Sequence, residues 1–438
     1  RAIIANNGPE SPTHHQGRYM KKILPLAVLA AAVALSACSK KDDVTVSAKA
    51  DGPLVVRVGH AAPLTGPQAH LGKDNENGVR LAIDELNAGG FEIGGRKVEF
   101  ELISEDDQAD PRIATTVAKK FVDDGVNVII GHLNSGTTIP SSRIYHDANI
   151  VQVSPSATNP KFTLQGYKNA FRVMANDIQQ GKALGEFAVK DVGAKKIAII
   201  DDRTAYGQGL ADEFEKAVKA NGGTIIVREF TNDKASDFTA ILTKIKGTAP
   251  DLIFFGGMDG QGAPMAKQMK TLGLNARFMG GDGIHTAEFM KLAGPAAEGV
   301  VASLPGVPLD VMPHGPEFKK RFEAKYGVIQ LYAPYCYDAM MVIAQAMKRA
   351  GSAESAKYLS EMPKTNYDGV TANIVFDPHG DLTNASISVY TVEGGKWKLM
   401  RTVSGPTTPV VIADSTATST APATAPAADV TPAAAPAK

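Results

Sequence analysis

Four side chains with the chemistry to bind a small charged molecule each follow a short apolar run that reads as a strand. Ser135 and Thr158 lie in loops rich in small hydroxyl residues, GHLNSG and SPSATN, while Tyr206 lies in DDRTAYGQG and Asp282 in GGDG. Hydroxyl and backbone N–H groups suit a carboxylate, an aspartate suits a cation, and a tyrosine offers an apolar face with a hydroxyl tip. A zwitterion bound between two lobes requires such a divided site, because each unpaired buried charge costs several kcal/mol.

Each of these residues also has a plainer interpretation. Ser, Thr, Gly and Pro are ordinary turn formers after strands, and an aspartate between glycines is a common turn residue. A serine hydrolase is an alternative because His132 shares a loop with Ser135, but no acid that would orient the histidine is recognisable. The sequence contains no GxSxG, GxxxxGK[ST], HExxH or CxxC motif. We therefore expect a binding protein that is not an enzyme and that has no cofactor and no metal.

Alternating strands and helices would position these residues. Apolar runs at residues 126–130 and 150–153 flank a helical pattern over residues 138–148, which predicts a βαβ unit with buried parallel strands. Parallel strands end at the same edge of a sheet, where open α/β sheets bind ligands. Both hydroxyl loops should therefore face one crevice, and the helix opening just after Ser135 would direct its free N–H groups there.

Similar strand–helix units recur before and after residue 175, including a helix expected at residues 264–272. They predict an α/β protein with two similar doubly wound lobes, a hinge and a ligand cleft between the lobes. The hinge should consist of three crossings, near residues 171–180, 303–308 and 384–388. The expected lobes are residues 54–175 plus 306–385 for lobe 1, and residues 176–305 plus 386–403 for lobe 2.

Composition limits the function classes. The 438 residues include 46 basic and 46 acidic side chains, so the formal net charge is zero and nothing indicates nucleic-acid binding. Cys38 and Cys336 are the two cysteines. If the chain is cleaved before Cys38, no intramolecular disulfide is available.

The first 53 residues contain a stretch that resembles a signal peptide. Met20 and two lysines are followed by a short apolar run and then by Leu-Ser-Ala-Cys, which ends at Cys38. This order resembles the signal peptide and lipobox of bacterial lipoproteins. We expect an upstream extension at residues 1–19, a signal peptide at 20–37 and a tether at 38–53. The Ala/Pro/Thr-rich residues 404–438 are expected to be disordered.

The folded region resembles the periplasmic leucine/isoleucine/valine-binding proteins, type I solute-binding proteins of branched-chain amino-acid ABC importers. The resemblance covers nearly all of residues 54–401 and is carried by the motifs LTGPQAHLG, AIDELNAGG, GHLNSGTTIPSS, SPSATNP, AYGQGLAD, FMGGDG and FDPHGDL.

The resemblance implies a role for each matching residue. Ser135 and the backbone amide of Thr158 would bind the carboxylate of an amino acid. The Thr158 hydroxyl, the Ser156 carbonyl and the Asp282 carboxylate would bind its ammonium group, and Tyr206 would close over the ligand. Ala157 belongs to the same loop and counts among the ligand-binding residues.

Asp282 stands where the branched-chain binders often carry Glu, so the charge is kept on a shorter side chain. Four further positions depart from the family pattern. Leu71 and Met258 replace aromatic residues that usually pack on the ligand, although both can still form an aliphatic pocket. Ala109 and Asn134 stand where the family has disulfide-forming cysteines, so that bridge is absent.

The expected function is capture of an L-amino acid, branched-chain or otherwise aliphatic, by hinge closure in the bacterial periplasm. The partners would be an ABC permease and its ATPase, with a lipid as the only link to the membrane and the protein itself a monomer. The alternative is a ligand-sensing protein of the same fold for amides, urea or small carboxylates.

Overall fold

The computed structural model describes residues 52–406. The predicted signal peptide, the tether as far as residue 51 and Cys38 lie outside this range. Within it, Cys336 is a buried free thiol, and none of the described helices is long and apolar enough to cross a membrane.

Lobe 1 contains a six-stranded sheet in the order β2-β3-β1-β4-β5-β6. β1, β3, β4, β5 and β6 are parallel, and β2 pairs antiparallel with β3. Both faces of β4 are buried, which explains its continuous apolar run. The strands are β1 Leu54–Ala62, β2 Glu92–Ile93, β3 Arg96–Asp106, β4 Val128–Gly131, β5 Val151–Ser154 and β6 Ala170–Arg172.

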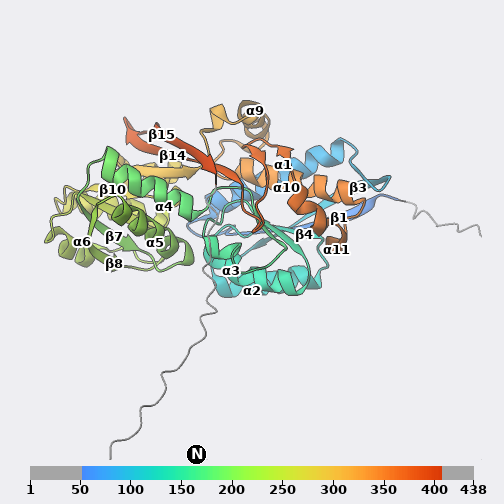
Figure 1. Ribbon diagram of the computed structural model, residues 1–438, viewed down its shortest axis with the longest axis horizontal. Helices are drawn as coiled ribbons and strands as arrows, with labels where there is room; N and C mark the ends of the chain where they lie inside the picture. The colour runs from blue at the N-terminus through green and yellow to red at the C-terminus, as the bar shows by residue number, and fades with distance from the viewer. Residues whose placement is uncertain (1–51, 407–438) are drawn as a thin grey trace, which may run out of the picture. The chain divides into compact units, whose positions relative to one another are not determined.

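Six helices belong to this lobe, and α10 lies beside α1 although the two are far apart in the chain (Figure 1). Asp110 caps α2 by accepting hydrogen bonds from the amides of Arg112 and Ile113. A small antiparallel ribbon of β12 Tyr367–Asp368 and β13 Asn373–Ile374 follows the last helix. The helices are α1 Ala69–Ala88, α2 Pro111–Asp123, α3 Ser135–Asp147, α9 Gly315–Tyr326, α10 Ala333–Ala350 and α11 Ser355–Tyr358.

Lobe 2 contains a seven-stranded sheet in the order β15-β14-β11-β10-β9-β7-β8. The strands from β7 to β11 are parallel, and β14 and β15 add an antiparallel edge. The strands are β7 Lys196–Asp201, β8 Thr224–Phe230, β9 Leu252–Gly256, β10 Arg277–Gly280, β11 Val301–Pro305, β14 Asn384–Glu393 and β15 Lys396–Pro406. The helices are α4 Asp177–Glu186, α5 Ala205–Ala220, α6 Thr239–Lys246, α7 Asp259–Thr271 and α8 Ala287–Ala293.

The chain passes between the two sheets three times. It leaves the first sheet after β6, returns after β11 to the helices that pack on α1, and enters the second sheet again at β14. Two mixed sheets confirm the predicted α/β fold with two lobes. The exact lobe boundaries stay a prediction.

Several expected element boundaries were wrong. α3 begins at Ser135, ahead of the helical pattern of residues 138–148 and in keeping with a helix that opens beside Ser135. α7 begins at Asp259 and not at Pro264, a proline that lies after its first turn. Such a proline removes one backbone hydrogen bond but does not end the helix. β15 runs to Pro406, so residues 404–406 belong to a strand where the sequence predicted a disordered tail.

Candidate functional site

The first hydroxyl loop delivers Ser135 to the start of α3. β4 ends at Gly131, and the turn that follows places Ser135 at the first position of the helix, where its side chain is buried. The Oγ atom of Ser135 accepts a hydrogen bond of 3.2 Å from the backbone amide of Asn159. The two hydroxyl loops therefore meet, as the parallel arrangement of β4 and β5 requires.

The second hydroxyl loop is held by Arg172, a fully buried residue at the end of β6. Its guanidinium donates to the carbonyl oxygens of Ala157 and Asn159 over 2.9 Å each, and to Asp381 Oδ1 over 2.6 and 3.0 Å. The amide of Ala157 also donates to Ser154 Oγ. Because a guanidinium carries five donors in a fixed plane, this one side chain fixes both the shape and the position of the loop.

Asp282 follows β10 in lobe 2 and is buried in a network of donors. Its Oδ1 accepts from the Tyr206 hydroxyl at 2.9 Å and from Gln180 Nε2 at 3.0 Å, and its Oδ2 accepts from the Tyr332 hydroxyl at 2.6 Å. Burial raises the pKa of the Asp282 carboxyl, and these three hydrogen bonds limit the rise. Gln180 also bonds to Asp177, whose pKa burial raises to about 7.

These groups surround a small cavity of about 10 Å³, enough for a single water molecule. The structure brings together five of the predicted binding residues on its wall: Ser135, Ser156, Tyr206, Met258 and Asp282. Leu133, Asn134 and Tyr332 complete the wall. The wall therefore combines side chains of both lobes, with hydroxyl groups on one side and a carboxylate on the other.

Three predicted residues do not line this cavity. Leu71 lies in the hydrophobic core, and Ala157 and Thr158 are buried but do not belong to the cavity wall. The carbonyl of Thr158 accepts from the amide of Asp177, at the first crossing between the lobes. Their roles in binding stay predictions.

Sequence reasoning missed Tyr332, Gln180 and Asn134. Tyr332 precedes α10 in the stretch LYAPYCYD, and Gln180 lies in the crossing stretch FRVMANDIQQ. The aromatic cluster before a predicted helix was the available signal for Tyr332. No spacing rule connects either residue to Asp282, because the three come from separate segments of the chain.

His132 does not activate Ser135. Its Nδ1 lies 2.7 Å from Asp107 Oδ2 and its Nε2 lies 2.9 Å from the Tyr145 hydroxyl, and all three side chains are fully buried. Since both ring nitrogens are engaged away from Ser135, the arrangement of a serine hydrolase is absent. Among the described residues, no group of three or more His, Cys, Asp or Glu side chains could hold a metal ion.

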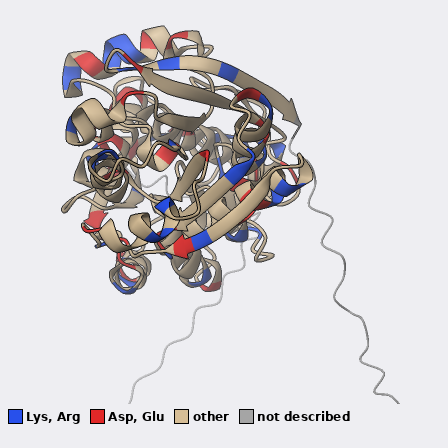
Figure 2. Cartoon of the chain, turned by 90° about the vertical axis from the view of Figure 1, so that its left-hand side faces the viewer, with Lys and Arg blue, Asp and Glu red and all other residues tan. Residues whose placement is uncertain are grey.

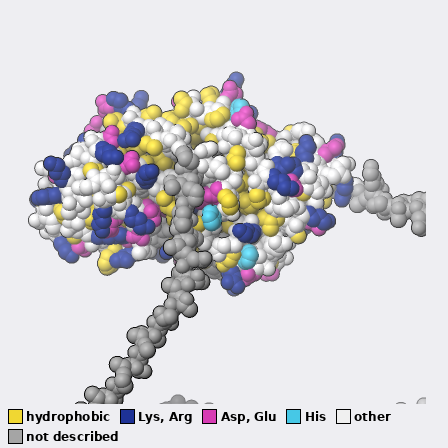
Figure 3. Space-filling model, in the orientation of Figure 1, with side chains coloured by type: hydrophobic (Ala, Val, Ile, Leu, Met, Phe, Trp, Pro, Cys, Tyr) yellow, Lys and Arg dark blue, Asp and Glu magenta, His cyan; other side chains and the backbone are white. Residues whose placement is uncertain are grey.

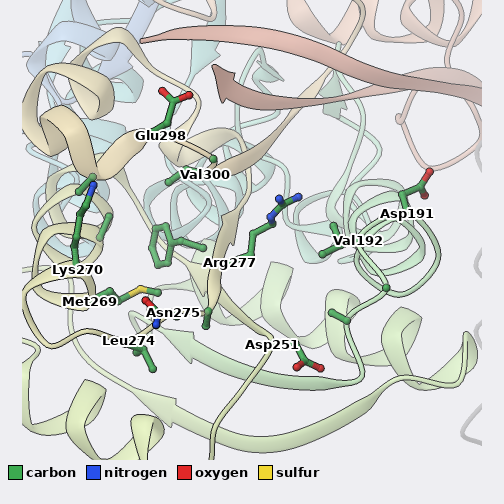
Figure 4. A pocket seen from close by; sticks show the side chains of 17 residues that line it. Asp191, Val192, Asp251, Met269, Lys270, Leu274, Asn275, Arg277, Glu298 and Val300 are labelled. Atoms are coloured by element: carbon green, nitrogen blue, oxygen red, sulfur yellow. The ribbon is translucent and has the colours of Figure 1, made fainter. Parts of the chain in front are cut away.

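A larger cavity of about 890 Å³ lies at the amino ends of strands in the lobe 2 sheet, opposite the ends that carry Asp282 (Figure 4). Its wall includes Asp251, Arg277 and Val300, at the amino ends of β9, β10 and β11. None of the predicted binding residues lines it, and Figure 4 shows Asp191, Asp251, Lys270 and Glu298 lying apart from one another around Arg277. Open α/β sheets bind ligands at the carboxyl ends of their strands, so we assign the candidate site to the smaller cavity.

The surface charges are mixed. Residues of both signs are spread along the helices and strands in Figure 2, and Lys, Arg, Asp and Glu side chains all occur on the face that Figure 3 shows. This mixture is in keeping with the zero net charge of the chain.

Comparison with known proteins gives matches along nearly the whole folded region. The family described as "Periplasmic binding protein" matches residues 55–396. The "Leu/Ile/Val-binding protein homolog 1" of Brucella suis is 38% identical over 344 residues, which cover 78% of this chain and 91% of the relative. The "Leucine-, isoleucine-, valine-, threonine-, and alanine-binding protein" of Pseudomonas aeruginosa is 35% identical, over 76% of this chain and 89% of the relative.

Two crystal structures of similar fold are the leucine-binding protein LivK of Thermotoga maritima and LivJ of Streptococcus pneumoniae in complex with isoleucine. The first superposes with a TM-score of 0.74 at 28% identity and covers 80% of this chain and 98% of that chain. The second has a TM-score of 0.73 at 26% identity and covers 80% of this chain and 100% of that chain.

Proposed function

Because the chain belongs to the periplasmic binding protein family, we propose that it is the substrate-binding subunit of an ABC importer and that it captures an L-amino acid between its two lobes. The matched relatives are binding proteins and not enzymes. Their names, together with the isoleucine held by the streptococcal protein, support an aliphatic or branched-chain ligand.

One observation carries the proposal. The buried carboxylate of Asp282 in lobe 2 and the buried hydroxyl of Ser135 in lobe 1 share the wall of one small cavity. An ammonium group would pair with Asp282, and a carboxylate would meet Ser135 and the start of α3, so both charges of a zwitterion would have a partner.

Binding requires the lobes to move. The cavity holds about one water molecule in the described conformation, far less than an amino acid needs. We propose that the lobes separate at the three crossings, admit the ligand and close over it, with Ser156, Ala157, Thr158 and Tyr206 forming contacts as they close. Leu71 and Met258 would then form the apolar part of the pocket.

Attachment to the membrane is part of this proposal. Cys38 would carry a lipid after removal of the signal peptide, so the protein would be tethered in the periplasm near its permease. Labelling with a radioactive fatty acid should depend on Cys38, and Cys38→Ser should release a soluble protein.

A thermal-shift panel tests the function. The full chain with Cys38→Ser, freed of carried-over ligand by unfolding and refolding, is melted with each common L-amino acid and with urea, short amides and simple carboxylates. A ligand at about a hundredfold its dissociation constant should stabilise the fold by about 2.7 kcal/mol. Shifts with aliphatic amino acids support the proposal. Shifts with amides, urea or carboxylates alone would contradict it and favour the sensor.

A further inference from the structure

A second cavity, of about 410 Å³, lies where the chain passes between the lobes. Its wall takes residues 173–175 from the first crossing, residues 305–307 from the second and residues 382–386 from the third. None of its wall residues lines the candidate site. Because all three crossings form it, the shape of this hinge pocket depends on the angle between the lobes.

The wall of the hinge pocket is mostly apolar. Val311 lies on it with 67% of its surface exposed, which is unusual for a valine in this chain. An exposed apolar group beside an apolar pocket favours an occupant that covers both. The principal aliphatic wall residues are Val173, Met174, Val307, Val311, Val375 and Leu382.

Several polar groups of the wall are already paired with one another. The Tyr335 hydroxyl donates to the carbonyl oxygen of Pro305 over 2.8 Å. The hydroxyl oxygens of Ser386 and Ser404 lie 2.8 Å apart. These groups need no partner in an occupant, so the pocket suits aliphatic side chains better than polar ones.

β15 leads the chain to this pocket. It is the edge strand of its sheet, with Gly405 opposite Ala385 and Pro406 opposite Asn384, the first residue of β14. Gly405 itself lines the pocket. Continuing this antiparallel register would bring the next residues opposite residues 383 and 382, which also line it. The register therefore directs the chain beyond Pro406 toward the pocket wall.

The sequence beyond Pro406 contains one cluster of aliphatic residues. Residues 409–413 read PVVIA, and the rest of residues 407–438 consists of Ala, Thr, Pro, Ser, Asp and Lys with a single valine, Val430. Val410 follows Gly405 by five residues, which allows a reach of up to about 17 Å. The cluster is thus tethered close to the pocket, and a short tether gives it a high effective concentration there.

We propose that Val410, Val411 and Ile412 dock in the hinge pocket and hold the two lobes together. The pocket is formed in a conformation in which the Tyr332 hydroxyl of lobe 1 donates to Asp282 of lobe 2. A segment seated in the pocket stabilises the conformation that forms it, and so it slows the separation of the lobes. The docking stands without the proposed function, whereas its effect on the release of an amino acid rests on that function.

Melting of the ligand-free full chain with Cys38→Ser tests the docking. Ile412→Asp and Val311→Asp should each lower the melting temperature by about 2–4 °C, because either carboxylate expels the segment from an apolar pocket. Together they should lower it no further than the larger single effect, since the same contact is lost in each case. Val430→Asp is the matched control and should leave the melting temperature unchanged. The exposure of Val311 makes its substitution harmless to the core.

Stopped-flow release of L-valine tests the effect on the hinge. Ile412→Asp should speed up release about fivefold, and Val430→Asp should not. Equal release rates for these two variants would overturn the role in holding the lobes together.

The outcomes separate this inference from the proposed function. Equal melting temperatures for Ile412→Asp and Val430→Asp, or additive effects of Ile412→Asp and Val311→Asp, would overturn the docking and leave amino-acid binding standing. An effect of Val311→Asp alone would also overturn it and indicate a separate molecule or a second copy of the chain as the occupant. The predicted melting pattern without binding of any amino acid would support the docking and contradict the proposed function.

Discussion

The hydroxyl of Tyr332 donates to Asp282 Oδ2 over 2.6 Å, and the two residues come from opposite lobes. Tyr332 lies just before α10, which packs on α1 in lobe 1, and Asp282 follows β10 in the sheet of lobe 2. The bond can form only when the lobes are together. Asp282, which we propose to bind the ammonium group of the amino acid, therefore also stabilises the closed form.

Tyr332→Phe should weaken binding of the amino acid about tenfold, mainly through faster release. The substitution removes one hydrogen bond to a charged group and leaves the ring in place. Tyr358→Phe is the matched control, because that buried hydroxyl donates to the carbonyl of Asn127 within lobe 1. Stopped-flow dissociation rates measure the effect, and equal rates for the two variants would contradict it.

Asp282→Asn should raise the dissociation constant at least a hundredfold while the ligand-free melting temperature changes little. The amide keeps the shape of the carboxylate but lacks the charge that the ammonium group needs. Asp338→Asn is the control. That carboxylate is buried in lobe 1 and accepts from the amides of Val370 and Thr371, so its loss should lower the melting temperature without affecting the dissociation constant. Unchanged affinity in Asp282→Asn would refute the ammonium assignment.

The affinity for the ligand should fall as the pH rises from 5.5 to 8, because His70 loses its proton and with it the charge that pairs with Asp259. Nε2 of His70, in lobe 1, lies 2.9 Å from Oδ2 of Asp259, in lobe 2. Burial lowers the pKa of His70, but the bond and charge of Asp259, with Glu288 nearby, outweigh it and raise the pKa.

Protonated His70 therefore stabilises the closed form. This stabilisation is fully present below the ordinary pKa of histidine and is lost as the pH rises through the raised pKa of His70. We expect a fewfold change in affinity, since partly exposed ion pairs contribute about 1 kcal/mol or less. His70→Gln should flatten this part of the pH profile, and a profile that survives unchanged would exclude the pair.

Asp177 should make the fold less stable at high pH. Burial raises its pKa from 3.8 to about 7, so between these values the folded chain holds a proton that the unfolded chain releases. The free energy of unfolding must then fall as the pH rises through this range. Asp177→Asn mimics the protonated acid, so urea denaturation should show that its stability relative to the wild type rises with pH, with a clearly larger gain at pH 8 than at pH 5.

The sequence predicted the parts of the site that depend on local pattern. Apolar runs that end in hydroxyl loops indicated parallel strands, and the common edge of such strands explains why Ser135 and the loop of Ser156 meet. The meeting of Asp282 with Tyr332 could not be predicted in this way, because the two residues lie in different lobes and closure brings them together. Leu71 and Thr158 were assigned from the family resemblance, and both are buried without lining the cavity in the described conformation.

The central claim is that Asp282 and Ser135 together bind an amino-acid zwitterion. Calorimetric titration of the full chain with Cys38→Ser, using L-valine, its deaminated analogue 3-methylbutanoate, and urea, tests this claim most directly. The amino acid should bind with one site per chain, while removal of the ammonium group should weaken binding at least a hundredfold. Equal affinity for 3-methylbutanoate, or binding of urea alone, would contradict the account.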